Sequence, residues 1–134
     1  MKGRRRLSKA QLLPLPTDQV RRLSLKHHLA LTCLAAGQGG VESLSTLSNV
    51  VDIAQRIDNI NATVLEKAHV AVDSCVARAE REQRFMLTET EHAAIAAALV
   101  LHDAQLQLVP SHRYIAALEQ TALKAQQLAE PAAS

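Results

Sequence analysis

Residues 50–79, VVDIAQRIDNINATVLEKAHVAVDSCVARA, decide the fold of this chain. Their apolar side chains follow one another in steps of three and four residues: Val50, Ile53, Ile57, Ile60, Val64, Ala68, Ala71, Cys75 and Ala79. Positions three and four apart lie on the same side of an α-helix, so this spacing is typical of a helix with one buried face. The sequence therefore predicts helical structure throughout this stretch.

Residues 41–85 are compatible with one long helix or with two shorter ones. One helix of about 40 residues would be about 60 Å long, since each residue adds about 1.5 Å. Two helices would separate near residues 58–61, where Asn59 or Asn61 is a good N-cap for the second helix. The unbroken apolar face slightly favours a continuous or mildly kinked helix, and both arrangements remain open at this point.

Helix signals also occur on both sides of this stretch. Residues 17–36 begin with threonine, which is a good N-cap, and are followed by a glycine that can end the helix. Thr88 and Glu91 have the spacing of a capping box, and they predict a helix over residues 88–108. A serine at the start of residues 111–129 is expected to cap a last helix.

The predicted helix at residues 17–36 is apolar on more than one side. One stripe consists of Val20, Leu23, Ala30, Leu31 and Leu34. A second apolar surface consists of Leu25, Leu29 and Cys33. A helix with several apolar faces is typically buried, so we expect the second half of this helix to lie inside the domain.

The composition favours an all-α protein. Leucine and alanine, two of the strongest helix formers, supply most of the apolar side chains, whereas Phe85 and Tyr114 are the only aromatic residues. With 134 residues, the chain has the usual size of one domain. We predict a four- or five-helix up-and-down bundle over residues 17–130, preceded by a flexible basic arm at residues 1–16 and followed by a frayed tail at residues 131–134.

Three features favour a cytoplasmic protein. Cys33 and Cys75 are too few for a disulfide framework, and both lie in apolar, helix-periodic surroundings. The longest apolar run, residues 93–101, has about half the length that a membrane span requires. The basic start of the chain is followed by an apolar segment that is too short and too broken by proline for an export signal.

The charge is unevenly distributed along the chain. Residues 1–41 carry eight Lys or Arg and one acid, and residues 42–134 carry seven Lys or Arg and twelve acids, which gives +7 and −5. The near-neutral total of +2 therefore combines a basic front end with a mildly acidic body.

Two Glu-x-x-His pairs, Glu66 with His69 and Glu89 with His92, have the spacing of ligands in di-metal helical bundles. Their positions argue against a shared site. In an antiparallel hairpin, His92 would face about residue 82, roughly 20 Å along the axis from His69. His69 also projects about 140° from the centre of the apolar face of its helix. We therefore predict no metal site and no cofactor.

His102 lies on the apolar face of the predicted helix 88–108, so it points to the core or to an interface. The hairpin register brings His69 and Asp73 to the level of His102 and Asp103, but His69 and Asp73 face away from the apolar side of their helix. We interpret His102 as a core or interface residue. At an interface it would make association pH-sensitive.

Signatures of catalysis do not occur in the sequence. There is no Gly-x-Ser-x-Gly turn, and neither cysteine has an adjacent basic cluster that would hold a thiolate. The glycine-rich residues 37–40 follow a predicted helix instead of a strand, so they do not form a phosphate-binding loop. We predict that the protein is not an enzyme and has no catalytic residues.

The segment Leu12-Leu13-Pro14-Leu15-Pro16 allows two interpretations. Extended apolar residues stiffened by proline lose little entropy when they bind in a groove, so the segment can dock on a partner. Alternatively, its leucines fold back onto the core of the domain, which we consider the stronger interpretation.

We predict a non-enzymatic helical interaction protein, a small adaptor, regulator or inhibitor that acts by binding another protein. The candidate partner-binding residues are Arg4, Arg5, Arg6, Lys9, Leu12, Leu13, Leu15, Arg21, Arg22, Lys26 and His102. The apolar helix faces are also compatible with a homodimer. The alternative is a nucleic-acid-binding regulator that uses the basic arm and the helix at residues 17–36. No membrane contact is expected.

Overall fold

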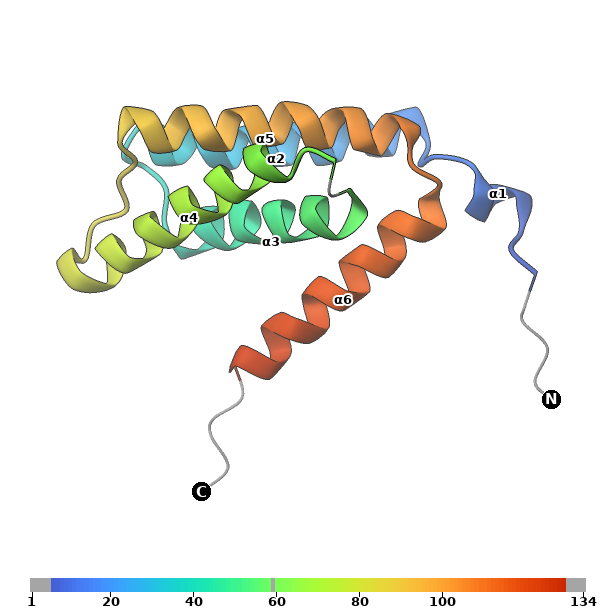
Figure 1. The fold of residues 1–134 in the computed structure, drawn as a ribbon. Helices are drawn as coiled ribbons and strands as arrows, with labels where there is room; N and C mark the ends of the chain where they lie inside the picture. Colours follow the sequence, from blue (N-terminus) through green and yellow to red (C-terminus); the bar gives the residue numbers. More distant parts are fainter. Residues whose placement is uncertain (1–5, 59, 130–134) are drawn as a thin grey trace, which may run out of the picture.

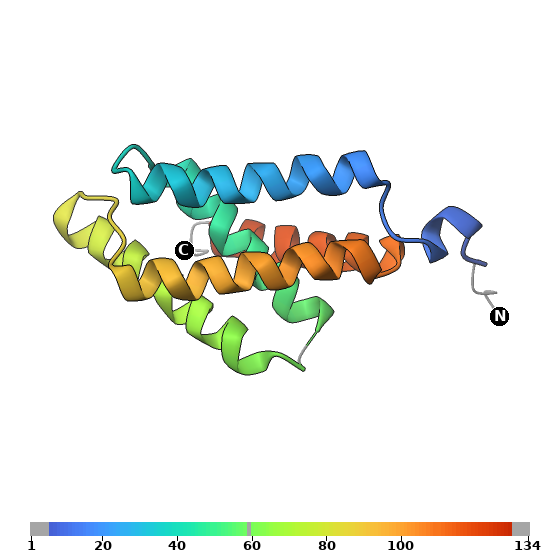
Figure 2. The same ribbon diagram turned by 90° about the horizontal axis from the view of Figure 1, so that it is seen from above.

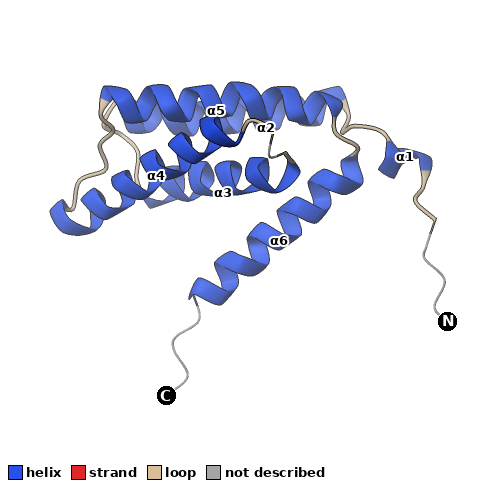
Figure 3. Cartoon of the chain, in the orientation of Figure 1, coloured by secondary structure: helices blue, strands red, loops and turns tan. Residues whose placement is uncertain are grey.

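The computed structural model describes residues 6–58 and 60–129, and these residues are all-helical, as predicted (Figures 1 and 3). Their helices are α1 (Lys9–Leu12), α2 (Thr17–Ala35), α3 (Val41–Ile57), α4 (Ala62–Glu82), α5 (Glu89–Leu108) and α6 (Ser111–Ala129). No strand occurs within these described ranges. Each helix in this part of the chain is too short or too polar to cross a lipid bilayer.

The four helices α2 to α5 pack against one another, whereas α6 lies at their edge. α2 and α5 run side by side in opposite directions, and α4 lies on the other flank of α5 (Figure 2). α3 contacts α2, α4 and α5. α6 packs mainly on α3 and on the one-turn helix α1, and its C-terminal end leans away from the other helices (Figure 1).

Residues 41–85 contain two helices, so the slightly favoured prediction of one continuous helix is wrong. Asp58 has an extended backbone (φ −148°, ψ 128°), which ends α3. Its carboxylate accepts hydrogen bonds from the Ile60 amide at 2.7 Å and from the Asn61 side chain at 3.3 Å. The break lets α4 fold back onto α3, and Ile60, which the spacing placed on the apolar face, is 90% exposed.

The core consists of two clusters of buried side chains. The larger cluster joins α2 to α5 and includes Leu34, Leu47, Leu65, Ile95 and Leu99. The smaller cluster lies where α6 meets the ends of α2, α3 and α5; its buried members are Val20, Ile53, Ile57, Leu106, Tyr114 and Ala117. Residues 122–128 of α6 are exposed, as expected for the part of the helix that leans away from the core.

The predicted capping box at the start of α5 is confirmed. The Thr88 hydroxyl accepts a hydrogen bond from the Glu91 amide at 3.1 Å, and the Glu91 carboxylate accepts one from the Thr88 amide at 2.9 Å. These bonds satisfy two backbone donors that the helix itself leaves without partners. The capping box therefore fixes the point at which the chain enters α5.

The loop between α2 and α3 passes very close to α2 at Gly39. A Cβ atom on Gly39 would lie 2.5 Å from Leu34 Cδ2 and 3.0 Å from Leu34 Cα, and Leu34 is buried. Gly39→Ala is therefore expected to lower the free energy of unfolding by about 1–3 kcal/mol, because the loop or the helix must shift. Gly40→Ala meets nothing within 4 Å and is the matched control. Thermal and urea denaturation of both variants test this, and equal stabilities would contradict the close approach.

Candidate functional site

The predicted binding residues of the N-terminal arm lie at the surface where the structure describes them. Arg4 and Arg5 fall outside the described residues. Arg6 and Lys9 are exposed, as are the side chains of Leu12 and Leu13. The exposed members of this segment remain accessible to a partner.

The rest of the arm lies against the domain. Leu15 is half-buried and packs on the smaller core cluster, so this leucine folds back as the second interpretation of the segment expected. The Ser111 amide donates a hydrogen bond to the Leu13 carbonyl at 2.7 Å, and its hydroxyl donates to the Ala10 carbonyl at 2.9 Å. The start of α6 thus holds α1 and the following turn in place.

The outward side of α2 is exposed, whereas the sequence predicted that it is buried. Leu25 is 60% exposed and Leu29 is 51% exposed, so the expectation that this second apolar surface is buried is wrong. α2 packs on α3 and α5 through its other stripe, and no described helix covers this side. Two leucines one turn apart therefore lie open to solvent on one helix.

Three cations surround these leucines. Arg21, Arg22 and Lys26 are exposed and, at 100° per residue, lie within the same outward arc of α2 as Leu25 and Leu29. Within the described ranges, none of the three forms an ion pair with an acid of this protein. Their charges are therefore available to an external partner.

The neighbouring helix α5 extends this surface. His28 contacts Asp103 across the α2–α5 junction, with 2.8 Å between His28 Nε2 and Asp103 Oδ2. Val100 lies three residues before Asp103, so at 100° per residue its side chain projects about 60° away from Asp103 around α5, and it is 64% exposed. The surface made by Arg21, Arg22, Leu25, Lys26, Leu29 and Val100 is called the α2–α5 face below.

His102 does not belong to any surface. Its relative exposure is zero, so the assignment of this residue to partner binding is wrong, and it is a core histidine. Its Nδ1 lies 2.8 Å from the Gln105 side-chain oxygen, and the Gln105 amide donates to the Ala54 carbonyl of α3 at 3.1 Å. The side chain of Gln105 thus connects the imidazole of α5 to the backbone of α3.

Sequence reasoning missed the partners of His102 and Asp103. They are His27 and His28 of α2, whereas His69 and Asp73 pair with each other at 3.1 Å on the exposed side of α4. A signal was present: position 27 fills the gap in the apolar stripe between Leu23 and Ala30, at helical spacing. A histidine in such a gap is expected to be buried.

A second surface feature is a groove of about 680 Å³ between α3, α4 and the end of α6. Its apolar lining includes Val41, Leu44, Val76, Phe85 and Leu128. Glu80 is the one charged residue among those that line it, so the groove offers little to orient a charged ligand. No group of three or more His, Cys, Asp or Glu side chains suited to a metal ion occurs in the part of the chain that the structure describes.

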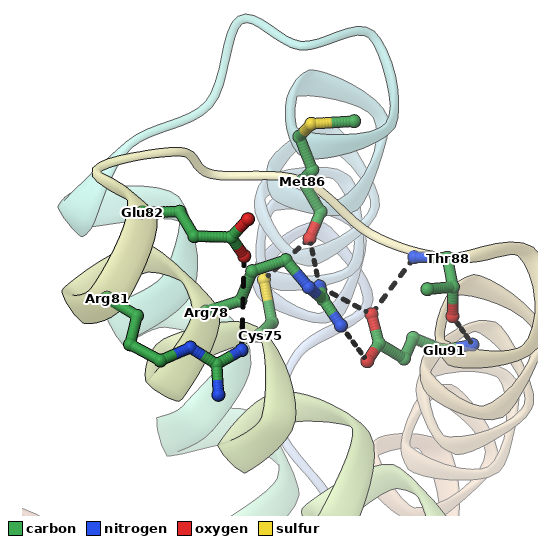
Figure 4. Close-up of polar contacts among 7 residues, drawn as sticks. All are labelled: Cys75, Arg78, Arg81, Glu82, Met86, Thr88 and Glu91. Carbon is green, nitrogen blue, oxygen red and sulfur yellow. Dashed lines mark hydrogen bonds and ion pairs between the residues drawn. The ribbon is translucent and has the colours of Figure 1, made fainter.

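The most extensive polar cluster closes the hairpin between α4 and α5 (Figure 4). Arg78 donates two hydrogen bonds to the Glu91 carboxylate, at 3.0 and 2.7 Å, and a third to the Met86 carbonyl at 2.7 Å. The Cys75 thiol, whose pKa is raised mainly by burial, donates to the same carbonyl at 3.2 Å. Each group has a structural partner, so this cluster holds the hairpin and leaves no reactive group free.

Comparison with family models, curated proteins and solved structures found no significant match to this chain.

Proposed function

We propose that this protein is a non-enzymatic helical interaction protein, a small adaptor, regulator or inhibitor, and that its α2–α5 face binds an acidic and partly apolar segment of another protein. The observation that carries the proposal is the pattern on α2, in which exposed leucines lie between cations without acidic partners. The leucines call for apolar side chains in the bound segment, and the cations call for acidic ones.

The leucines supply the favourable free energy of such a complex. Leu25, Leu29 and Val100 each leave more than half of their accessible surface in water. Burying a whole aliphatic side chain is worth about 1.5–3 kcal/mol, so covering what remains of each contributes about 1 kcal/mol. A partner that covers the face gains this contribution without rearranging the domain.

The cations orient the partner and accelerate its association with the protein. Arg21, Arg22 and Lys26 follow one side of a regular helix, so their spacing is fixed by the backbone. Opposite charges on a partner accelerate the encounter and select one binding orientation more than they strengthen the final complex. The expected partner therefore places Asp or Glu beside apolar side chains.

A nucleic acid is the alternative ligand for the same cations. Phosphate contacts need cations, but they leave exposed leucines uncovered, and the described residues place no aromatic side chain on this face on which a base could stack. The apolar half of the α2–α5 face therefore favours a protein. Crosslinks to DNA or RNA in the experiment below would indicate a nucleic-acid ligand instead.

The experiment places a photoreactive amino acid at position 25, and separately at position 70 of α4 as a control. Val70 is also an exposed apolar residue, 54% exposed, on a different face. In host-cell extract, we expect protein crosslinks from position 25 and far fewer from position 70. Mass spectrometry of the crosslinked peptide should show Asp or Glu beside apolar residues.

Two double variants then measure the contribution of the leucines and that of the cations separately. Leu25→Ala with Leu29→Ala should weaken binding of the identified partner about 10- to 50-fold, since about 1.4 kcal/mol corresponds to a factor of ten. Arg22→Glu with Lys26→Glu should slow association, and the same charge change at Lys67 and Arg81 of α4 should not. Equal crosslinking at both positions, or crosslinks mainly to nucleic acid that survive the leucine substitutions, would refute the proposal.

A further inference from the structure

Two histidine rings lie in contact inside the junction between α2 and α5. The ring centroids of His27 and His102 are 5.6 Å apart, and both residues are buried. One ring comes from each helix. Any change in the charge of either ring therefore acts on the packing of α2 against α5.

The hydrogen bonds of this junction suit neutral rings. The Gln105 side-chain oxygen accepts from His102 Nδ1, so the neutral ring has its proton on Nδ1 and a lone pair on Nε2. His102 Nε2, His27 Nδ1 and Asp103 Oδ1 are buried without a hydrogen-bond partner in the described part of the protein. A proton added to His102 Nε2 would create a buried donor without an acceptor, beside a second imidazole.

The surroundings provide little compensation for such a charge. On α2, the charged or titratable neighbours are Lys26 and His28, and on α5 they are His102 and Asp103. The Asp103 carboxylate is the one acid of this set, and one of its oxygens already binds His28. One lysine, two further histidines and a single carboxylate therefore lie around His27.

The other packed helices add no acid. α3 approaches the rings through the Ala54 carbonyl, and its charged pair Asp52 and Arg56 faces α6. On α4, which packs on the far side of α5, Arg78 binds Glu91 at the end of the hairpin, and His69 binds Asp73 at the surface. The packed helices thus offer a protonated ring the Asp103 carboxylate as the one nearby acid, and burial outweighs it.

We propose that the contact between His27 and His102 is an acid-sensitive latch, which holds α2 on α5 while both rings are neutral and loosens α2 when one ring is protonated. This regulation rests on the proposed function, because α2 carries most of the α2–α5 face. The outer contact between His28 and Asp103 also joins the two helices, but it is partly exposed and contributes less than the buried rings.

The direction of the pH effect follows from burial. Burial, followed by the neighbouring His102, lowers the pKa of His27 to about 4 from an ordinary value of 6.5, and burial also lowers the pKa of His102. The folded protein therefore binds these protons less well than the unfolded chain. The latch contributes its full stability above about pH 6.5 and loses it progressively as the pH falls towards about 4.

The decisive measurement is an NMR titration of the histidine ring protons in the wild-type protein, together with hydrogen exchange of α2 and α4 at neutral and acid pH. We expect His27 to titrate near pH 4 and α2 to lose protection before α4 does. For His27 alone, the unfolding equilibrium constant should increase about 50-fold between about pH 7 and about pH 4.5. A titration of His27 near pH 6.5 would overturn the latch without any variant.

His27→Phe keeps a ring at this position but cannot be protonated, and His69→Phe is the matched control at the surface of α4. His27→Phe should remove most of the acid-induced loosening of α2, whereas the control should loosen as the wild type does. If phenylalanine is too large to fold there, His27→Gln replaces it. Full acid sensitivity in the His27 variant would refute the latch. None of these measurements needs a partner. A negative result here therefore refutes the latch and not partner binding at neutral pH, whereas absent crosslinking from position 25 refutes partner binding and not the latch.

Discussion

Replacing Leu99 with alanine is expected to lower the free energy of unfolding by about 3–5 kcal/mol. Leu99 is fully buried in α5, inside the larger core cluster. The substitution removes apolar contacts and leaves a cavity, because helices packed at crystal-like density cannot close the space completely. Urea denaturation followed by circular dichroism measures the difference between the variant and the wild type.

The matched control is Leu108→Ala in the same helix. Leu108 is 77% exposed, so the same substitution removes few contacts there and should change the free energy of unfolding by less than about 0.5 kcal/mol. Equal losses in the two variants would show that α5 does not turn Leu99 towards the core.

Replacing Glu91 with glutamine is expected to cost about 3 kcal/mol at neutral pH. Glu91 is buried and accepts two hydrogen bonds from Arg78, which is itself only partly exposed (Figure 4). A glutamine can still complete the capping box with Thr88, so the loss reports the charged pair and not the helix cap. Glu89→Gln removes the same charge from an exposed position in the same turn and should change stability far less.

The effect of this substitution should depend on pH. The hydrogen bonds from Arg78 hold the pKa of Glu91 below its ordinary value, so the folded protein binds that proton less well than the unfolded chain. The stability from the pair is therefore present above about pH 4.3 and lost as the pH falls below it. The gap between the wild type and the variant should shrink in acid, and a gap that is constant down to about pH 3 would exclude the ion pair as its cause.

The helices and several of their ends were determined by the sequence alone. The spacing of apolar residues, the capping box of Thr88 and Glu91 and the glycine after α2 act over three or four residues. Such signals are local, because a helix closes its hydrogen bonds within one turn of the chain. The all-helical fold and the start of α5 followed from them. Thr17 and Ser111, which were expected to be N-caps, are instead the first residues of α2 and α6, and the N-cap of α2 is Pro16.

The tertiary structure decided which apolar faces are covered. Leu25 and Leu29 have the same local signal as the buried stripe of α2, yet they remain exposed, because the four-helix group places no helix on that side. The meeting of His27 with His102 likewise depends on residues far apart in the chain. Periodic apolar spacing shows that one face of a helix can be buried. Whether that face becomes part of the core or stays exposed depends on which distant helices pack against it, and one apolar face can pack against more than one possible neighbour.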